Sequence, residues 1–246
     1  MADIQILNNQ AHASLKIANG YPTSCADYYG STMVFASEIE RVQAEYSIFF
    51  RKDPDTSQFY PCIFLGFAQD ENLFIEDNKW LAHYIPLAIS RGPFVISLQQ
   101  RKQVNGGSIE HPVVGINVNH PNVNSEKGEA IFDAQGNQTE FAEVMTSKLN
   151  AIQQGLQENK KMIDMFNQFD LIEPVSLDVE LADKQNVKLQ GIYTINDQKL
   201  AQLSADALYQ LNNSGFLPLA FFIARSINNI SVLINKKNAK LVIQDE

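Results

Sequence analysis

TEFAEVMTSKLNAIQQGLQENKKMIDMFNQFDLIEPVSLDVEL, residues 139–181, changes its hydrophobic period part-way along. Up to Phe166 the apolar residues follow one another at steps of three, four or seven, which predicts a long amphipathic helix ending near Phe166 or Phe169. Thr139 is a suitable N-cap for this helix. The apolar residues then alternate strictly with polar ones, at Val175, Leu177, Val179 and Leu181. This second pattern predicts a strand with one face in water.

Downstream, residues 183–186 read as a turn and residues 187–194 as the partner strand of a hairpin. Asn196 and Ser204 can each cap a short helix, and Gly215 can end the second one. A last helix is expected with Pro218 in its first turn. Its apolar stripe comprises Leu219, Ile223, Ile227, Ile230 and Ile234.

Upstream, the pattern predicts one short helix in residues 35–46 and another in residues 83–90. Strands are expected at residues 46–50, 59–68, 73–75, 94–98 and 113–118. Residues 70–72 suggest a tight hairpin, residues 105–108 a turn, and Gly66 a bulge or a close backbone approach. The links are short, so this first-half sheet is expected to be mostly antiparallel, and the fold class is α+β.

The turn signals of residues 1–30 predict an irregular N-terminal segment. Residues 31–246 are then expected to form one domain. A polar loop at residues 120–128 marks a candidate sub-boundary near residues 119–130.

Composition excludes several classes of function. The chain has 246 residues, of which 45% are hydrophobic, and a formal net charge of -9. Such a balance disfavours nucleic acid as a partner, because no basic run exceeds two residues. The apolar stretch at residues 216–223 is too short for a membrane span. The first residues carry no signal-peptide pattern, so a cytoplasmic location is expected.

No nucleotide-binding, zinc-protease or hydrolase motif occurs, and we expect no cofactor, no metal site and no catalytic residue. Cys62 lies in an apolar strand, where a cysteine is usually inert. Cys25 lies in a polar loop with no base nearby in the sequence. His111 and His120 flank a predicted strand, which would hold them about 30 Å apart and unable to share a metal.

The segment WLAHYIPLAISRGPF, residues 80–94, concentrates unusual residues, including the single tryptophan, two prolines and one arginine. Two interpretations stay open. In the first, the segment lines a pocket in which Arg91 holds a carboxylate or phosphate. In the second, it is a rigid corner, with Trp80 and Phe94 in the core and Arg91 bonded to carbonyl groups.

The same segment resembles the W-L-x-x-Y-I-P-x-x-x-x-R-x-P-F signature of the bacterial SapC family. The matching residues are Trp80, Tyr84, Ile85, Pro86, Arg91, Pro93 and Phe94. Further similarities run in family order from about residue 30 to residue 238, among them Glu38 and residues 169–174. A departure occurs at Ser47, where the family usually has proline after the tyrosine.

The resemblance implies a family named after a surface-layer gene cluster, distinct from the peptide-permease subunit of the same name. Relatives are encoded beside TonB-dependent receptors, tryptophan-halogenase-like proteins and cupin-like proteins. We therefore expect a non-catalytic binding or accessory protein linked to peptide or carbohydrate uptake or modification. Its partner would be a halogenase-like or cupin-like protein, or a small peptide or carbohydrate ligand.

Two other hypotheses remain. One is a structural protein of the surface layer. The other is an enzyme of unrecognised type, which requires its polar groups to converge in one cavity. The candidate ligand-binding residues for a pocket are Trp80, His83, Tyr84, Arg91, Phe94 and Glu38.

Overall fold

The computed structural model describes residues 2–102, 108–124 and 126–244, and it confirms the α+β class. The strands are β1 (Ile4–Ile6), β2 (Lys16–Ile17), β3 (Ser31–Met33), β4 (Ile48–Lys52), β5 (Phe59–Phe64), β6 (Ile75–Glu76), β7 (Lys79–Trp80), β8 (Phe94–Lys102), β9 (Ser108–Asn117), β10 (Val123–Asn124), β11 (Glu129–Ala130), β12 (Ile172–Glu180) and β13 (Asn186–Ile195). The α-helices are α1 (Ile39–Val42), α2 (Leu87–Ser90), α3 (Glu140–Gln168), α4 (Asp197–Ala201), α5 (Ala205–Asn213), α6 (Leu217–Ser226) and α7 (Ile230–Gln244). Within the same described ranges, 3-10 helices occupy Ala26–Tyr28, Ala36–Glu38 and Ile227–Asn229.

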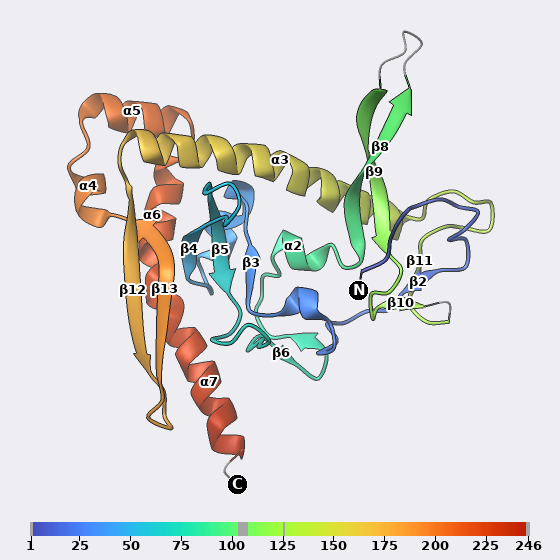
Figure 1. Ribbon diagram of the computed structural model, residues 1–246, viewed down its shortest axis with the longest axis horizontal. Helices are drawn as coiled ribbons and strands as arrows, with labels where there is room; N and C mark the ends of the chain where they lie inside the picture. The colour runs from blue at the N-terminus through green and yellow to red at the C-terminus, as the bar shows by residue number, and fades with distance from the viewer. Residues whose placement is uncertain (1, 103–107, 125, 245–246) are drawn as a thin grey trace.

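The hairpin after the long helix belongs to the same sheet as the first strands. The five-stranded order is β12-β13-β4-β5-β3, with every neighbouring pair antiparallel. The two halves of the chain join where Tyr193 of β13 lies opposite Phe50 of β4. Strands β8 and β9 leave this sheet and pair with β1 instead, forming the hairpin that projects from the other end of the molecule (Figure 1).

The tight hairpin predicted at residues 70–72, between the strands expected at residues 59–68 and 73–75, does not form. The strand that follows is β6, and its partner is β7 rather than β5. Asp77 and Asn78 join β6 to β7 with φ of 49° and 60°, the left-handed conformations of a two-residue type I′ turn. The close approach predicted at Gly66 is confirmed, because a Cβ there would lie 2.6 Å from the carbonyl oxygen of Glu71.

Two short strands lie in the N-terminal segment that the sequence predicted to be irregular. Strand β1 places Ile4 opposite Asn117 of β9, and β2 lies between β10 and β11. Strands of three and two residues are too short to show an alternation of side chains, which is why the pattern missed them. The turn predicted at residues 105–108 falls on residues outside the described ranges, apart from Ser108, where β9 begins.

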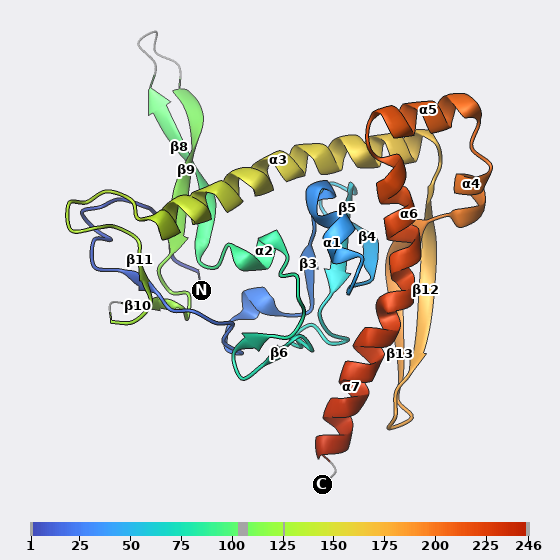
Figure 2. The ribbon, with the colours of Figure 1, turned by 180° about the vertical axis from the view of Figure 1, so that it is seen from behind.

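Helix α3 connects two hydrophobic clusters, and it runs from the end of the five-stranded sheet to the β8–β9 hairpin (Figures 1 and 2). The side chain of Thr139 caps its first turn as predicted. Near its start, Ala142 and Leu149 pack in the cluster of β8 and β9. Near its end, Met162 and Phe166 pack in the larger cluster of the five-stranded sheet.

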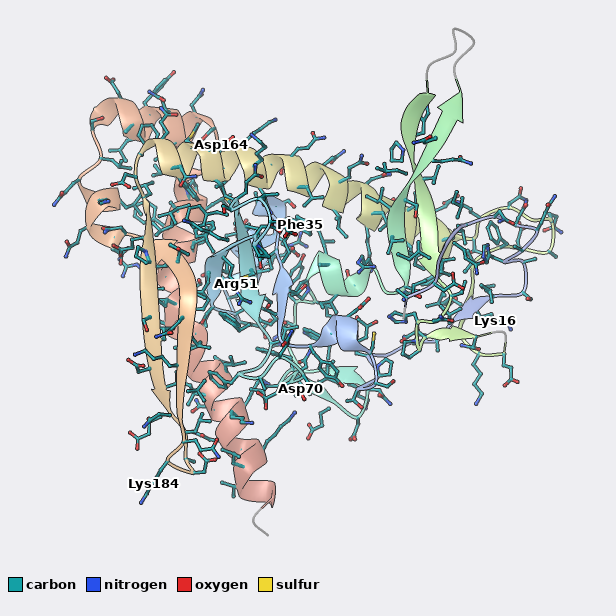
Figure 3. The ribbon with its side chains drawn as sticks, in the orientation of Figure 1. Lys16, Phe35, Arg51, Asp70, Asp164 and Lys184 are labelled. Carbon is teal, nitrogen blue, oxygen red and sulfur yellow. The ribbon has the colours of Figure 1, made fainter. Side chains whose placement is uncertain are left out.

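The middle of α3 lies against the chain between β3 and α1. A Cβ on Gly155 would come 2.8 Å from the Phe35 side chain, which lies just beneath the helix (Figure 3). One turn later, Asn159 donates to the carbonyl of Val34 and accepts from the amide of Ala36. The missing side chain of Gly155 and the two hydrogen bonds of Asn159 therefore set how closely α3 approaches the sheet.

Helices α6 and α7 form one nearly continuous helical stretch along β12 and β13 (Figure 2). Leu217–Val242 is longer than the apolar stretch predicted from the sequence, and within the described residues it alone is long and apolar enough, by length and composition, to cross a membrane. Its exposed positions include Arg225, Asn228, Ser231 and Asn235. The apolar side chains Ile223 and Leu233 are buried against the protein.

Candidate functional site

The first half of the 80–94 segment is held by a chain of hydrogen bonds. Trp80 Nε1 donates to the Tyr46 hydroxyl at 2.8 Å, and that hydroxyl donates to the Tyr84 carbonyl at 2.7 Å. The Tyr84 hydroxyl in turn donates to Oε2 of Glu38 at 2.8 Å. Trp80 also stacks on Phe74, so this half forms a rigid corner of the core.

Glu38 is a fully buried carboxylate at the centre of this corner. Its Oε1 accepts from the amide of Phe35, and its Oε2 accepts from the amide of Leu87 as well as from Tyr84. Burial raises the pKa of this carboxyl, although the three donors and Arg41 act in the opposite direction. With every contact internal, Glu38 ties α1 to α2.

His83 points away from the corner. Its side chain is 98% exposed, and Nδ1 lies 3.1 Å from Oε1 of Glu45. Glu45 also accepts from the backbone amides of His83 and Tyr84. Among the predicted site residues, Glu38, Tyr84 and Trp80 thus form one network, while His83 stands on the surface.

Arg91 and Phe94 border a cavity of about 230 Å3 that we call the Arg91 cavity. Its walls come from residues 17–21, Tyr28, residues 89–94, Asn122 and three residues of α3, namely Phe141, Met145 and Lys148. Tyr28 and Ile89 belong to the larger hydrophobic cluster, whereas Ile17 and Phe94 belong to the smaller one. The cavity therefore lies at the junction of the two clusters.

Arg91 fits both interpretations of the 80–94 segment, because it bonds to carbonyl groups and also lines a cavity. Its Nη1 donates to the carbonyl oxygens of Phe94, at 2.8 Å, and Gly92, at 3.3 Å. Its Nη2 lies 3.8 Å from Oδ2 of Asp27. Its side chain is a quarter exposed and lines the cavity. Arg91 thus fixes the turn between α2 and β8 while keeping guanidinium surface at the cavity.

A second cation reaches the same wall from α3. Lys148 Nζ donates to the carbonyl oxygen of Ser90 at 3.1 Å, next to Arg91 in the chain. Burial lowers the pKa of this lysine, since the charged form loses hydration. The described residues that line the cavity include no aspartate or glutamate. The lining is thus basic in a chain of net charge -9, and Asp27, with Oδ2 3.8 Å from Nη2 of Arg91, compensates part of that charge from outside the lining.

Asn122 lines the cavity, and its side chain also carries an unsatisfied polar atom. The residue is 6% exposed, and its Nδ2 donates to the carbonyls of Ala18 and Gly20. Its Oδ1 is buried and has no hydrogen-bond partner among the described residues. A buried acceptor without a donor costs about 1–3 kcal/mol, and since this oxygen has almost no accessible surface, the cost belongs to the fold rather than to a ligand contact.

A model of the SapC family matches residues 7–233, which is most of the chain. The chain belongs to the SapC family. No curated protein and no solved structure matches it. The match spans both hydrophobic clusters and every residue named at the Arg91 cavity, so the cavity lies within the family region of this SapC protein.

The structure corrects the expectation that Cys25 has no base nearby. Nε2 of His120 lies 3.2 Å from Sγ of Cys25 and 3.3 Å from the hydroxyl of Tyr28. With Asp27, these residues place three potential metal ligands within 4.8 Å of one another. The sequence predicted only that a strand would separate His120 from His111. The residues that lie beside His120, Cys25 and Tyr28, come from the N-terminal segment.

Hydrogen bonding decides what this Cys25–His120 pair can do. The backbone amide of Asn122 donates to Nδ1 of His120 at 3.1 Å, so the proton of the neutral ring is on Nε2. Nε2 then faces Cys25 as a donor, and it can act neither as a base nor as a metal ligand in this arrangement. Burial raises the pKa of the Cys25 thiol and lowers the pKa of His120, which keeps both neutral.

Sequence reasoning missed the cavity residues outside the 80–94 segment. Tyr21 and Tyr28 lie in a segment predicted to be irregular, and Lys148 lies on a helix whose polar residues all look alike in the pattern. Asn122 carried one available signal, because it lies in a polar loop that was singled out as a boundary. Nothing in its local sequence indicates that Oδ1 is left unpaired.

Proposed function

We propose that this SapC-family protein is a non-catalytic binding protein that holds a small ligand in the Arg91 cavity. The observation that carries the proposal is the Arg91 cavity itself, where the basic side chains of Arg91 and Lys148 meet apolar side chains from both hydrophobic clusters. A hollow in which a few polar groups converge beside apolar walls is typical of a ligand site. The role as an accessory to peptide or carbohydrate uptake or modification, beside a halogenase-like or cupin-like partner, is part of the same proposal.

Three observations favour binding over catalysis. None of the described residues that line the cavity is histidine, cysteine, aspartate or glutamate, the side chains that most often transfer protons in enzymes. Burial raises the pKa of both Tyr21 and Tyr28, so their hydroxyls stay protonated. The polar set expected for an enzyme also fails to converge, because Glu38 and Tyr84 bond to each other and His83 is exposed.

A larger hollow of about 460 Å3 lies between the β4–β5 turn and α3, but its charges are already satisfied. Lys160 pairs with Asp164 at 3.0 Å, and Nζ of Lys52 lies 4.9 Å from the centre of the Phe59 ring. Asp53 accepts hydrogen bonds from its own turn. Arg91 is likewise paired with Asp27, so the two hollows differ instead in charge: Asp53 and Asp164 line the larger one, whereas the described lining of the Arg91 cavity has no aspartate or glutamate.

The test measures the melting temperature of the full chain with free amino acids, dipeptides, monosaccharides and sugar phosphates as probes. Met145→Trp fills the cavity, and Val144→Trp, on an exposed position of the same helix outside the cavity lining, is its matched control. A ligand at about a hundred times its Kd should raise the melting temperature of the wild type and Val144→Trp by about 5–10 °C. Met145→Trp should show no shift.

The proposal would be overturned if no probe class raised the melting temperature of Val144→Trp more than that of Met145→Trp. The non-catalytic part is tested on the same samples. A probe that binds should be recovered chemically unchanged by mass spectrometry after prolonged incubation, and a converted product would show an enzyme instead.

A further inference from the structure

Residues 120–124, which follow β9, hold part of the N-terminal segment beside the Arg91 cavity. We call residues 120–124 the His120 turn and residues 18–28 the N-terminal strap. We infer that His120 is an acid-sensitive latch: protonation of its Nδ1 breaks the His120 turn, detaches the N-terminal strap from it and opens the Arg91 cavity on that side. The opening itself needs no ligand, whereas its effect on a ligand rests on the proposed binding function.

The N-terminal strap is attached to the His120 turn by side-chain and backbone hydrogen bonds. Nδ2 of Asn122 donates to the carbonyl oxygens of Ala18 and Gly20, at 2.7 Å and 2.8 Å. The amide of Ala18 donates back to the carbonyl oxygen of Asn122 at 2.8 Å. These three bonds all meet at Asn122, so the attachment of the strap depends on the shape of the turn that carries this residue.

The ring of His120 contacts the turn and the strap at once. His120 is 3% exposed, and its Nδ1 accepts from the amide of Asn122 at 3.1 Å. On the other side of the ring, Nε2 lies 3.2 Å from Sγ of Cys25 and 3.3 Å from the hydroxyl of Tyr28. The neutral ring therefore uses one nitrogen as an acceptor and the other as a donor.

A proton on Nδ1 is incompatible with this arrangement. The imidazolium form carries an N–H group on both nitrogens, so Nδ1 would change from an acceptor to a donor. It would then face a second donor, the N–H group of Asn122, at 3.1 Å. The backbone amide cannot reverse its direction unless the turn that carries it changes shape. Charging His120 therefore displaces Asn122, which holds Ala18 and Gly20.

Among the described residues, the ionisable groups that act on His120 come from the strap and from the turn after α2. Cys25 and Tyr28 stay neutral, because burial raises the pKa of both. Asp27 favours the charged ring and Arg91 opposes it, and these two side chains lie 3.8 Å from each other. Burial has the largest effect and lowers the pKa of His120. The surroundings therefore do not stabilise an imidazolium in the closed arrangement.

Acid favours the opened state. In the opened state the ring regains its ordinary pKa of 6.5, whereas its pKa in the closed state is lower. The closed state is therefore most stable above pH 6.5, and this stability is lost as the pH falls through the closed-state pKa. While the closed ring stays neutral, each pH unit below 6.5 raises the opening equilibrium by about tenfold.

Other contacts keep the change local. The amide of Tyr21 donates to the carbonyl oxygen of Asn78 at 2.8 Å, and Nδ2 of Asn72 donates to the carbonyl oxygen of Tyr28. Before the strap, β2 pairs with β11 as well as with β10. These bonds do not involve His120, so we expect the strap to open between fixed ends while the five-stranded sheet stays folded.

The opening reaches the Arg91 cavity because the strap and the turn supply part of its lining. Residues 18–21 and Tyr28 come from the strap, and Asn122 comes from the turn. A ligand in the cavity would lose its contacts with these residues in the opened state. Acid should therefore weaken binding at the site of the proposed function.

Cys25 reveals the opening without any ligand. It is 4% exposed and contacts His120, whereas Cys62 is 1% exposed and lies on β5. A pyridyl disulfide reagent reacts with exposed thiols in acid as well as at neutral pH, and peptide mass spectrometry locates the label. Each labelling rate is divided by the rate for the denatured chain at the same pH, which removes the pH dependence of the reagent. Local opening labels Cys25 alone, and unfolding labels both cysteines.

His120→Asn removes the titration and can keep the turn. Oδ1 of an asparagine accepts from the backbone amide two residues on, as Nδ1 of His120 does, and the group does not ionise. His111→Asn, at an exposed position of β9, is the matched control. Between about pH 7.5 and about pH 5, Cys25 labelling should accelerate at least about fivefold in the wild type and in His111→Asn. In His120→Asn it should change by less than about twofold.

A measurement on the wild type keeps the test valid if His120→Asn does not fold. Titration of the four histidine rings by NMR should give a midpoint for His120 at the pH where Cys25 labelling accelerates. The inference is wrong if these midpoints differ, if His120→Asn and the wild type gain labelling alike, or if acid exposes both cysteines together.

The labelling experiment and the probe experiment can fail separately. Labelling that does not depend on His120 would overturn the latch and leave binding of the probes at neutral pH untouched. If no probe binds in a way that depends on Met145, the proposed function is wrong, and labelling alone decides the latch. A probe that does bind should bind the wild type at least about fivefold more weakly at about pH 5 than at about pH 7.5. Equal weakening in His120→Asn would overturn the acid control of the cavity.

Discussion

The hydroxyl of Tyr84 donates a hydrogen bond of 2.8 Å to Oε2 of Glu38, a carboxylate without solvent exposure. The bond connects the 80–94 segment, which carries the SapC signature, to the 3-10 helix that ends at Glu38, across 46 residues of chain. The guanidinium of Arg41 covers the Tyr84 ring at 4.8 Å and adds a positive charge near the pair. Stability of the corner should therefore depend on both partners.

Removing the hydroxyl should show this directly. Tyr84→Phe leaves Oε2 of Glu38 with one donor instead of two, and we expect the free energy of unfolding to fall by about 1.5–3 kcal/mol. Chemical denaturation gives the value. Tyr209→Phe is the control, because Tyr209 is 71% exposed, and it should change stability by less than about 0.5 kcal/mol. Equal effects of the two variants would show that the Glu38–Tyr84 bond contributes nothing.

Replacing the carboxylate should also destabilise the protein. Glu38→Gln turns an amide group toward at least one of the backbone N–H donors from Phe35 and Leu87, which leaves a donor unpaired. The expected loss is about 1–3 kcal/mol of unfolding free energy. An unchanged or higher stability of Glu38→Gln would contradict the role assigned to this carboxylate.

The pH dependence of this loss follows from the raised pKa of Glu38. Between the ordinary value of 4.5 and the raised value, the folded state binds more protons than the unfolded state. The stability that Glu38 contributes to the wild type is therefore complete below pH 4.5, and it is lost as the pH rises through the pKa of Glu38 in the folded state. The difference between wild type and Glu38→Gln should be largest at low pH and should shrink as pH rises. Denaturation curves of both proteins at several pH values measure this difference in stability. A difference that grows with pH would contradict the prediction.

Gly155 should reverse the usual effect of alanine in a helix. Gly→Ala inside a helix commonly stabilises by about 1 kcal/mol. Here the new Cβ would lie 2.8 Å from Phe35, and overpacking of this kind costs about 1–3 kcal/mol. We expect Gly155→Ala to lower the melting temperature. Asn150→Ala, at an exposed position of the same helix, should not, and a rise for Gly155→Ala would show that α3 can shift away from the sheet.

The two thiols should resist labelling in the folded protein. Cys25 and Cys62 are both buried, and burial raises the pKa of Cys62 to about 12. His120 cannot accept the Cys25 proton while Asn122 donates to Nδ1. A thiol reagent at neutral pH should modify neither cysteine until denaturant is added. Rapid labelling of Cys25 alone in the native state would show a reactive thiolate and favour an enzyme.

The elements that the sequence predicted well are those with long, regular patterns. Helix α3 begins after Thr139 and ends beside Phe169, as the three- and four-residue spacing indicates. Strand β12 follows the alternation of Val175, Leu177 and Val179. The Trp80 to Phe94 signature likewise led to the family that the comparison then showed. The candidate site was predicted only in part, since Arg91 and Phe94 line the cavity while Glu38 and Trp80 hold the corner.

The sequence by itself determined the α+β class, the order of the main elements and the SapC family, because each depends on side chains within a few residues of one another. Only the tertiary structure decided that β13 joins β4, that α3 spans two clusters, and that Lys148 and Asn122 share a cavity with Arg91. Asn122 reaches Ala18 across 104 residues, and Cys25 reaches His120 across 95. Contacts at such separations depend on how the whole chain packs, and no local period in the sequence encodes them.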